Sequence, residues 1–114
     1  MTSVRVPVAV AAAAVALTML GPGAASAACF EAVGCTNTQN FSTASLRRLS
    51  CDALWTVRNT IYYENGYCFH TARGMAVFDN SGCSFDDAGM VPLNNYERNN
   101  IERIVRVEKQ KGCR

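Results

Sequence analysis

Few side chains in this sequence have the types and spacing that acid–base or nucleophilic chemistry requires. Nucleophilic catalysis needs an activated nucleophile, a base and a group that orients the base, and His70 is the one histidine in the chain. Glu64, Glu97 and Glu102 are available for the carboxylate pair that a glycosidase uses. Glu64 stands near an expected helix end and Glu97 at a capping position, so each has a structural explanation. We therefore expect no enzyme activity, and a compact hydrolase is the least favoured function.

Aromatic rings around one arginine offer the clearest binding chemistry. Arg58 follows Trp55 by three residues and precedes Tyr62 by four, so both rings are within stacking reach on a helix. Either Arg58 braces the fold by pairing with a carboxylate on another helix, which we favour, or it belongs to a ligand-facing patch. If a ligand binds here, the expected contact set is Trp55, Arg58, Tyr62, Tyr63 and Tyr67.

Six cysteines indicate covalent cross-links. They are Cys29, Cys35, Cys51, Cys68, Cys83 and Cys113. An even number of cysteines in a small exported chain favours three disulfides, each of which typically contributes ~2–4 kcal/mol. Fifteen pairings of six cysteines are possible, and residue types alone do not choose among them. No C-x₂-C pair exists and Cys68-Phe69-His70 is not a zinc-site spacing, so we expect neither a metal nor a cofactor.

The first 27 residues have the layout of a secretory signal peptide. Arg5 supplies a positive charge, and Val8–Leu20 is an apolar, alanine-rich run that is short for a membrane span. Ala25-Ser26-Ala27 then forms a cleavage site of small residues. The sequence therefore predicts a protein that is secreted or periplasmic.

Cleavage after Ala27 would change the charge only slightly. Removing Arg5 leaves ten Lys and Arg against nine Asp and Glu, a net charge near +1, which argues against a nucleic-acid binder. No second long apolar run follows, so no transmembrane span is expected in the mature chain. A competing interpretation puts a lipid on Cys29, because Ser26-Ala27-Ala28-Cys29 faintly resembles a lipoprotein box. Serine fits that box poorly, and lipidation would leave one thiol unpaired.

Helical periodicity and capping residues predict a first long helix over Cys51–Glu64. Ser50 is a good N-cap, and Asp52 in the first turn suits the helix dipole. Asn65-Gly66 supplies a left-handed stop. The apolar stripe of this helix consists of Leu54, Val57 and Ile61.

A second long helix is expected near the C-terminus. Asn94 and Glu97 have the spacing of a capping box, and Gly112 marks the end of the helix. Its apolar stripe consists of Ile101, Ile104 and Val105. Thr71 is expected to cap a shorter helix over Ala72–Asp79.

These elements predict a mostly α fold: a small, disulfide-stapled helical domain with two longer helices, one short helix and irregular loops. Residues 28–48 are small and polar without sustained periodicity, and we expect an irregular N-terminal arm there. The predicted organisation is a signal peptide over residues 1–27, the arm over 28–48 and the helical domain over 49–114.

Two segments resemble the YARHG domain. The first runs from Leu54 to Tyr62 and continues with Gly66-Tyr67-Cys68-Phe69; the second begins at Val91-Pro92-Leu93-Asn94 and resembles the terminal helix of the family. Together they span about Leu49–Glu108. The name-giving Tyr-Ala-Arg-His-Gly signature is matched only at its ends, by Tyr62 and Gly66. Tyr63, Glu64 and Asn65 stand where the family has alanine, arginine and histidine.

The resemblance implies an exported accessory or interaction domain of the cell envelope, because the family is presumed extracellular and has no established activity. The alternative is a small secreted inhibitor, or another partner-binding protein of an exported enzyme, since disulfide-rich domains have preorganised surfaces. The resemblance also suggests the pairing of the cysteines: Cys29 and Cys35 lie outside the matched region, and the other four bracket its helices. The implied disulfides are Cys29–Cys35, Cys51–Cys113 and Cys68–Cys83.

Overall fold

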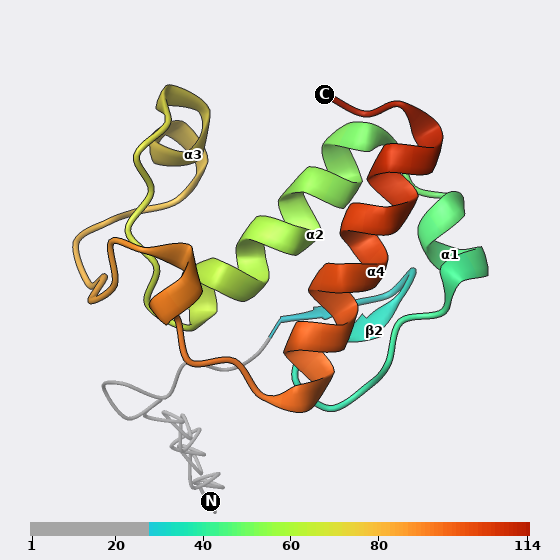
Figure 1. Cartoon of the computed structure of the whole chain (residues 1–114), viewed down its shortest axis with the longest axis horizontal. Coiled ribbons are helices and arrows are strands. Elements are labelled where there is room, and N and C mark those ends of the chain that lie inside the picture. The colour runs from blue at the N-terminus through green and yellow to red at the C-terminus, as the bar shows by residue number, and fades with distance from the viewer. Residues whose placement is uncertain (1–27) are drawn as a thin grey trace, which may run out of the picture.

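Two antiparallel helices, α2 (Cys51–Glu64) and α4 (Asn95–Lys111), form the centre of the fold (Figure 1). The computed structural model describes residues 28–114, and it confirms a mostly helical, disulfide-linked domain. The predicted signal peptide, residues 1–27, lies outside the described residues. Within 28–114, every helix is too short or too polar to cross a membrane.

Residues just outside α2 set its ends. The Ser50 hydroxyl accepts a hydrogen bond from the Ala53 amide at 3.1 Å, and Asp52 lies in the first turn. Beyond the last turn, Gly66 has a φ of 90°, a left-handed conformation that glycine adopts without strain. The predicted bounds of this helix are confirmed.

A reciprocal capping box starts α4. The Asn94 side chain accepts from the Glu97 amide, and the Glu97 carboxylate accepts from the Asn94 amide, both at 2.9 Å. The helix ends at Gly112, whose φ is 70°. The predicted apolar stripe omitted Val107, which is fully buried, and included Val105, which is only partly buried. Val107 stands three residues after Ile104, on the same face of the helix.

Aliphatic side chains from α2 and α4 fill the main core. A disulfide between Cys51 and Cys113 joins the first residue of α2 to the second residue beyond the end of α4. Full burial of one large apolar side chain stabilises a fold by roughly 1.5–3 kcal/mol. The buried core residues are Phe41, Leu46, Leu54, Val57, Ile61, Ile101, Ile104 and Val107.

The N-terminal arm is not irregular, so this expectation was wrong. Two short strands, β1 (Cys29–Phe30) and β2 (Gly34–Cys35), pair as an antiparallel hairpin, and α1 (Thr43–Arg47) packs against α4. Phe41 and Leu46 are fully buried in the main core. The arm was missed because its elements are too short to show periodicity, and distant contacts hold them in place.

Asn100 of α4 provides several of those distant contacts. Its side-chain oxygen accepts from the Phe41 amide at 2.8 Å, and its amide nitrogen donates to the carbonyls of Thr36 and Gln39. Arg103 donates to the Phe41 carbonyl at 2.8 Å. Because Asn100 is fully buried, these hydrogen bonds satisfy polar groups that burial would otherwise penalise.

Residues 66–94, here named the α3 lobe, connect α2 to α4. The lobe contains α3 (Ala72–Val77) and the 3-10 turn η1 (Ala88–Met90). The short helix ends at Val77 rather than at the predicted Asp79, because Phe78 turns to an extended backbone (φ −118°, ψ 136°) and stacks on Phe69.

A disulfide between Cys68 and Cys83 closes the lobe. Tyr67 forms an isolated parallel bridge with Phe85, and the Cys68 amide donates to the Phe85 carbonyl at 2.7 Å. Gly74 is buried, and a Cβ at this position would lie 2.8 Å from the Phe69 ring. Glycine therefore allows α3 to approach that ring closely.

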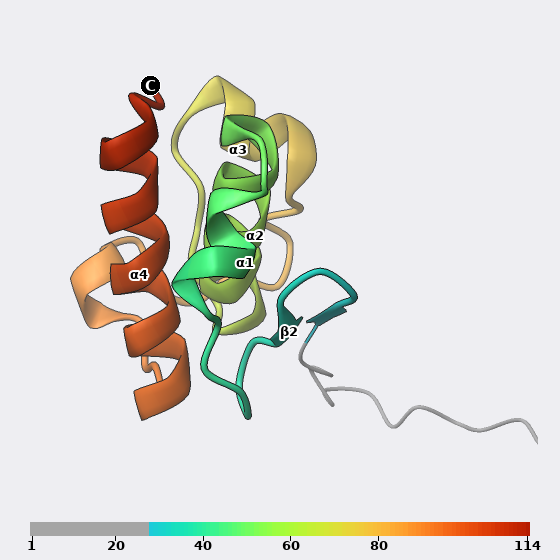
Figure 2. The ribbon, with the colours of Figure 1, turned by 90° about the vertical axis from the view of Figure 1, so that its right-hand side faces the viewer.

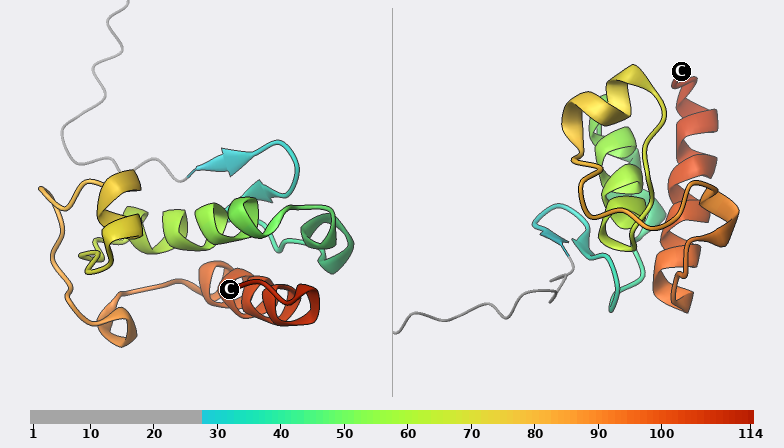
Figure 3. Two further views of the ribbon diagram at one scale, coloured as in Figure 1. Left: turned by 90° about the horizontal axis from the view of Figure 1, so that it is seen from above. Right: turned by 90° about the vertical axis from the view of Figure 1, so that its left-hand side faces the viewer.

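The elements surround α2 on several sides. The hairpin lies against the side of α2 that faces away from α4 (Figure 2). Seen from above, α3 lies at the C-terminal end of α2, on the side away from α4 (Figure 3). Consequently α2 is the element that connects the main core, the hairpin and the α3 lobe.

Candidate functional site

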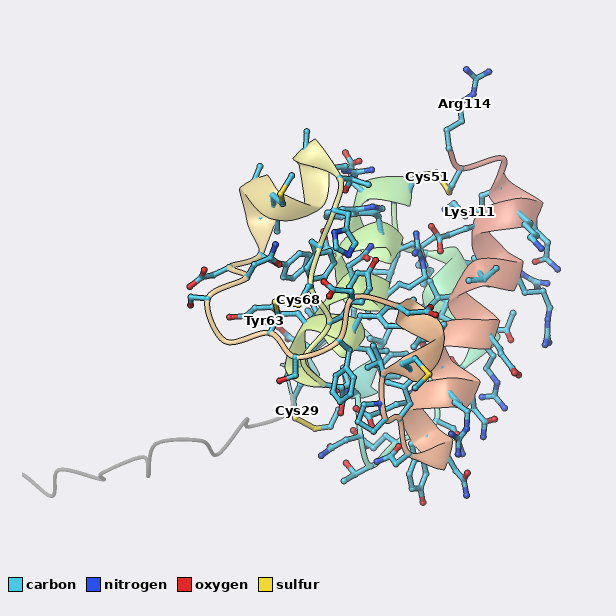
Figure 4. All side chains as sticks on the ribbon, turned by 60° about the vertical axis from the view of Figure 1, so that its left-hand side comes forward. Cys29, Cys51, Tyr63, Cys68, Lys111 and Arg114 are labelled. Atoms are coloured by element: carbon cyan, nitrogen blue, oxygen red, sulfur yellow. A yellow bond between two sulfur atoms is a disulfide. The ribbon has the colours of Figure 1, made fainter. Side chains whose placement is uncertain are left out.

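The five residues expected to contact a ligand do not form one patch. Arg58 faces α4, Trp55 and Tyr63 contact the α3 lobe, and Tyr62 contacts Tyr67. Figure 4 shows Tyr63 near Cys68 of the lobe, at the other end of the molecule from Lys111 and Arg114. The structure therefore separates the arginine from most of the aromatic rings.

Arg58 forms a two-pronged ion pair with Glu108 of α4. Its Nε lies 2.7 Å from Oε1 and its Nη2 lies 3.1 Å from Oε2. The two side chains are 25% and 14% exposed, so water screens this pair less than a surface pair. Arg58 braces α2 against α4, which is the role that the sequence favoured. The carboxylate lies fifty residues away in the chain, so spacing did not identify it.

The cation that stacks on Trp55 is Arg73 of α3, not Arg58. The Arg73 guanidinium carbon lies 3.9 Å from the centroid of the indole ring, within the range of a cation–π contact. Its Nη2 also lies 2.8 Å from a carboxylate oxygen of Asp52. Arg73 thus takes the position beside Trp55 where Arg58 was considered, and the sequence did not predict how α3 is placed against α2.

The remaining rings form a second, aromatic core that attaches the α3 lobe to α2. Phe69 and Phe78 stack with ring centroids 4.7 Å apart, and both are buried. Trp55 and Tyr63 of α2 contact Phe78 at 5.9 and 5.3 Å between centroids, while Tyr67 contacts Phe69 edge to face at 4.9 Å. Such ring pairs contribute roughly 0.5–1.5 kcal/mol each beyond the area they bury.

Three apolar side chains remain exposed on or beside α3. We name them the α3 face: Tyr63, Met75 and Val77. Their exposed fractions are 43%, 52% and 56%. Tyr63 contacts Phe78 of the aromatic core, while Met75 and Val77 stand two positions apart on α3 and so project from different sides of that helix.

Glu64 is held by the N-terminal arm. One carboxylate oxygen accepts from the backbone nitrogen of Ala28 at 2.6 Å, and the other accepts from the Thr36 hydroxyl at 3.0 Å. Burial raises the pKa of Glu64 above its ordinary value, these two hydrogen bonds lower it, and the nearby charge of Glu97 raises it. Glu64 therefore has a structural role in joining the arm to α2.

Asn65 extends this polar contact to α4. Its side-chain nitrogen donates to the Ile61 carbonyl at 2.7 Å and to Oε2 of Glu97 at 2.6 Å. Glu97 is 5% exposed, and its other carboxylate oxygen serves the capping box. The carboxylates considered for glycosidase chemistry, Glu64 and Glu97, are thus engaged with the backbone, whereas Glu102 is exposed.

His70 lies in the α3 lobe at the protein surface. Its Nε2 lies 3.0 Å from the Asp86 carbonyl and 3.6 Å from the carboxylate of the same residue. Elsewhere in the lobe, the Asp79 carboxylate accepts from the Ser81 hydroxyl and amide, and these bonds lower the pKa of Asp79. In the described part of the chain, no three His, Cys, Asp or Glu side chains are grouped as a metal site requires.

An apolar hollow of about 230 Å³ lies between the hairpin and α2. Phe30 and Val33 line it from the hairpin, and Ala53 and Val57 line it from α2. Polar groups that would orient a small molecule are scarce, with Thr56 the one hydroxyl-bearing residue in the lining. The hollow has the character of an imperfectly filled contact between two elements.

Comparison with known proteins identifies a family. The model of the YARHG domain matches residues 30–109, which include α2, the α3 lobe and most of α4. The chain belongs to the YARHG domain family. No curated protein and no solved structure matches the sequence.

The YARHG match begins earlier than the resemblance indicated. It starts at residue 30 rather than near Leu49, so most of the N-terminal arm, including Cys35, lies inside the domain. The structure has the same three disulfides that the resemblance implied, although Cys35 is not outside the matched region as that argument assumed. Family membership and the disulfides are consistent with an extracellular location.

The YARHG signature positions are structural in this chain. Tyr62 and Gly66 match the signature; Tyr62 packs against the main core, and Gly66 ends α2. Of the three positions that diverge from the signature, Glu64 and Asn65 hold the arm and α4, and Tyr63 contacts Phe78. The Glu64 carboxylate accepts from the Ala28 nitrogen and the Thr36 hydroxyl, whereas an arginine side chain has no acceptor.

Proposed function

We propose that this YARHG domain is a non-catalytic interaction module that is exported, as a secreted or periplasmic protein, after removal of residues 1–27. It binds an envelope component or another exported protein through the α3 face. The leader pattern in the sequence supports export, and the disulfides support an oxidising compartment.

The observation that carries this proposal is the exposure of three apolar side chains on or beside a disulfide-closed lobe. Tyr63, Met75 and Val77 are 43%, 52% and 56% exposed, while Phe69 and Phe78 of the lobe are stacked and the Cys68–Cys83 disulfide closes it. A surface that is already ordered loses little entropy when a partner binds. The same argument suits an inhibitor of an exported enzyme, so that function remains the alternative.

A non-catalytic role is supported by the contacts of the residues with acid–base chemistry. Glu64 accepts a hydrogen bond from the backbone nitrogen of Ala28 in the arm, and Glu97 accepts one from the Asn94 amide in the capping box of its own helix. Both carboxylates therefore have structural partners. The exposed His70 has a carbonyl as its nearest partner. A general base would instead need a proton within reach on a nucleophile or a substrate.

Site-specific photo-crosslinking in the producing cell tests the proposal. A photoreactive amino acid would replace Met75 of the α3 face, and a matched control would replace the exposed Glu102 of α4. We expect position 75 to give one dominant product that is absent at position 102. Tyr63→Ser and Val77→Ser should reduce that product at least tenfold while the protein remains exported and oxidised.

The identity of the cross-linked product separates the two functions. Retention on purified peptidoglycan that is lost in Trp55→Ala would support an envelope ligand, since Trp55 supports the lobe through Phe78 and Arg73. Cross-linking to an exported enzyme, with inhibition of that enzyme by the purified protein, would support the alternative. Equal cross-linking at positions 75 and 102, with no retention on peptidoglycan, would contradict the proposed role of the α3 face.

A further inference from the structure

The Glu64 carboxylate contacts the residue that would begin the mature protein. Oε1 of Glu64 lies 2.6 Å from the backbone nitrogen of Ala28, and Ala28 is the residue that follows the predicted cleavage site. The second oxygen, Oε2, is held by the Thr36 hydroxyl at 3.0 Å. The carboxylate is therefore oriented toward the atom that would become the new N-terminus.

One further contact holds Ala28 directly, and two hold the residue that follows it. The Thr36 amide donates to the Ala28 carbonyl at 3.0 Å. The next residue, Cys29, pairs with Cys35 across the hairpin and is joined to it by a disulfide. All of these contacts come from residues that remain after cleavage.

The charge around Glu64 is incompletely balanced. Among residues 28–114, the ion pairs of side chains are Arg58–Glu108, Arg73–Asp52 and His70–Asp86, and none involves Glu64 or Glu97. Glu97 of α4 faces Glu64 closely enough to raise its pKa, and both side chains are at least partly buried. Two such carboxylates without a cation are costly unless a positive group is supplied.

We propose that Glu64 is the binding site for the α-ammonium group of the mature chain, so that removal of the leader creates an ion pair that the precursor lacks. A leader peptidase adds water across the Ala27–Ala28 bond. The Ala27 carbonyl carbon becomes a carboxylate, and the Ala28 nitrogen becomes an ammonium. The neutral amide that donates one hydrogen bond to Glu64 is thereby replaced by a cation with three N–H donors. The inference rests on the cleavage that the proposed export requires, but it is independent of any ligand of the α3 face.

The ion pair has a defined dependence on pH. The ammonium lowers the pKa of Glu64 against the effect of burial and of Glu97, and the carboxylate raises the pKa of the Ala28 amino group above its ordinary value of about 7.7–8.0. Because the amino group then has a higher pKa in the folded chain than in the unfolded chain, the ion pair stabilises the fold fully at pH values below the pKa of the unfolded chain. This stabilisation is lost as the pH rises through the pKa of the folded chain.

The test uses the full chain, exported with its own leader. Its first step is an intact-mass measurement, which establishes whether the mature chain begins at Ala28. A matched variant carries Gly-Ser inserted between Ala27 and Ala28, so that cleavage leaves Ala28 as an internal amide. We expect the carboxyl pKa of Glu64, measured by NMR titration, to be at least about one unit lower in the chain that begins at Ala28 than in the inserted variant. One unit corresponds to a tenfold change in proton affinity.

Glu64→Gln provides the second comparison. We expect it to lower the denaturation midpoint more in the chain that begins at Ala28 than in the inserted variant, and we expect this difference to disappear above about pH 10. If Glu64→Gln does not fold, the titration of Glu64 in the two glutamate-bearing chains still decides the question. Equal pKa values in those chains, or a mature N-terminus other than Ala28, would overturn the inference without affecting the cross-linking test of the α3 face.

Discussion

The α2–α4 pair and the α3 lobe are built by different means. Aliphatic side chains and a disulfide that spans 62 residues hold the pair together. Aromatic rings and a disulfide that spans 15 residues hold the lobe. The pair buries its apolar stripes almost completely, whereas the lobe leaves Met75 and Val77 more than half exposed.

This difference teaches which region is scaffold and which can carry function. α4 packs along both α2 and α1, while α3 has no such extended contact with another helix. A region attached by a few side chains can open or change without unfolding the rest. The lobe can therefore vary its exposed surface, and the pair maintains the fold.

The largest effect is expected from removing the Cys51–Cys113 disulfide. Cys51→Ser with Cys113→Ser should lower the free energy of unfolding by about 4 kcal/mol, because the long loop gains much entropy in the unfolded chain. Chemical denaturation monitored by helical circular dichroism measures this change. Retention of wild-type stability would mean that aliphatic packing alone holds the pair.

Removing the Cys68–Cys83 disulfide should have a smaller and more local effect. Cys68→Ser with Cys83→Ser opens a shorter loop, worth about 3 kcal/mol in the same entropy model. Because the lobe can open separately, we expect the fluorescence of Trp55 to change before the helical signal is lost. Coincident transitions of both signals would show that the lobe and the pair unfold as one unit.

The ion pair between α2 and α4 should contribute less than either disulfide. Arg58→Met leaves the Glu108 carboxylate partly buried without its partner, and we expect a loss of about 2 kcal/mol. Glu108→Leu in the same chain should restore part of this loss, since no unpaired charge then remains. A double-mutant cycle in denaturant checks the coupling, and an additive result would contradict the bracing role of Arg58.

The smallest effect is expected at the exposed cation of the lobe. Arg73→Met removes the contact with Trp55 and the ion pair with Asp52, and we expect a loss of about 0.5–1 kcal/mol. Thermal denaturation at low and high salt measures it. An effect as large as that of Arg58→Met would show that the lobe depends on electrostatics more than on its rings.

The long helices of the fold were predicted better than its short elements. α2 and α4 were predicted almost to the residue, because Ser50, Asn94 and Gly112 provide capping signals that act locally. The hairpin and α1 were missed, because Phe41 and Leu46 become core residues only through contacts with distant helices. Short-range patterns in sequence cannot report such contacts.

The candidate site was predicted less well than the fold. The sequence correctly favoured Arg58 as a brace, and it selected Trp55 and Tyr63 as members of one aromatic set. Arg73 and Phe78 were missed as their partners, although both lie in the expected short helix. Their positions depend on how the Cys68–Cys83 loop returns to α2, and this geometry is not encoded in residue spacing.

Native-state hydrogen exchange on the oxidised, exported protein tests the central division most directly. The amide of Phe78, which donates to Gly74 in the lobe, is compared with the amide of Ile104 in α4 over increasing denaturant. We predict that Phe78 exchanges through a local opening, with a lower free energy and a weaker dependence on denaturant than Ile104. Equal opening free energies and equal denaturant dependences at the two amides would contradict a separately attached α3 lobe.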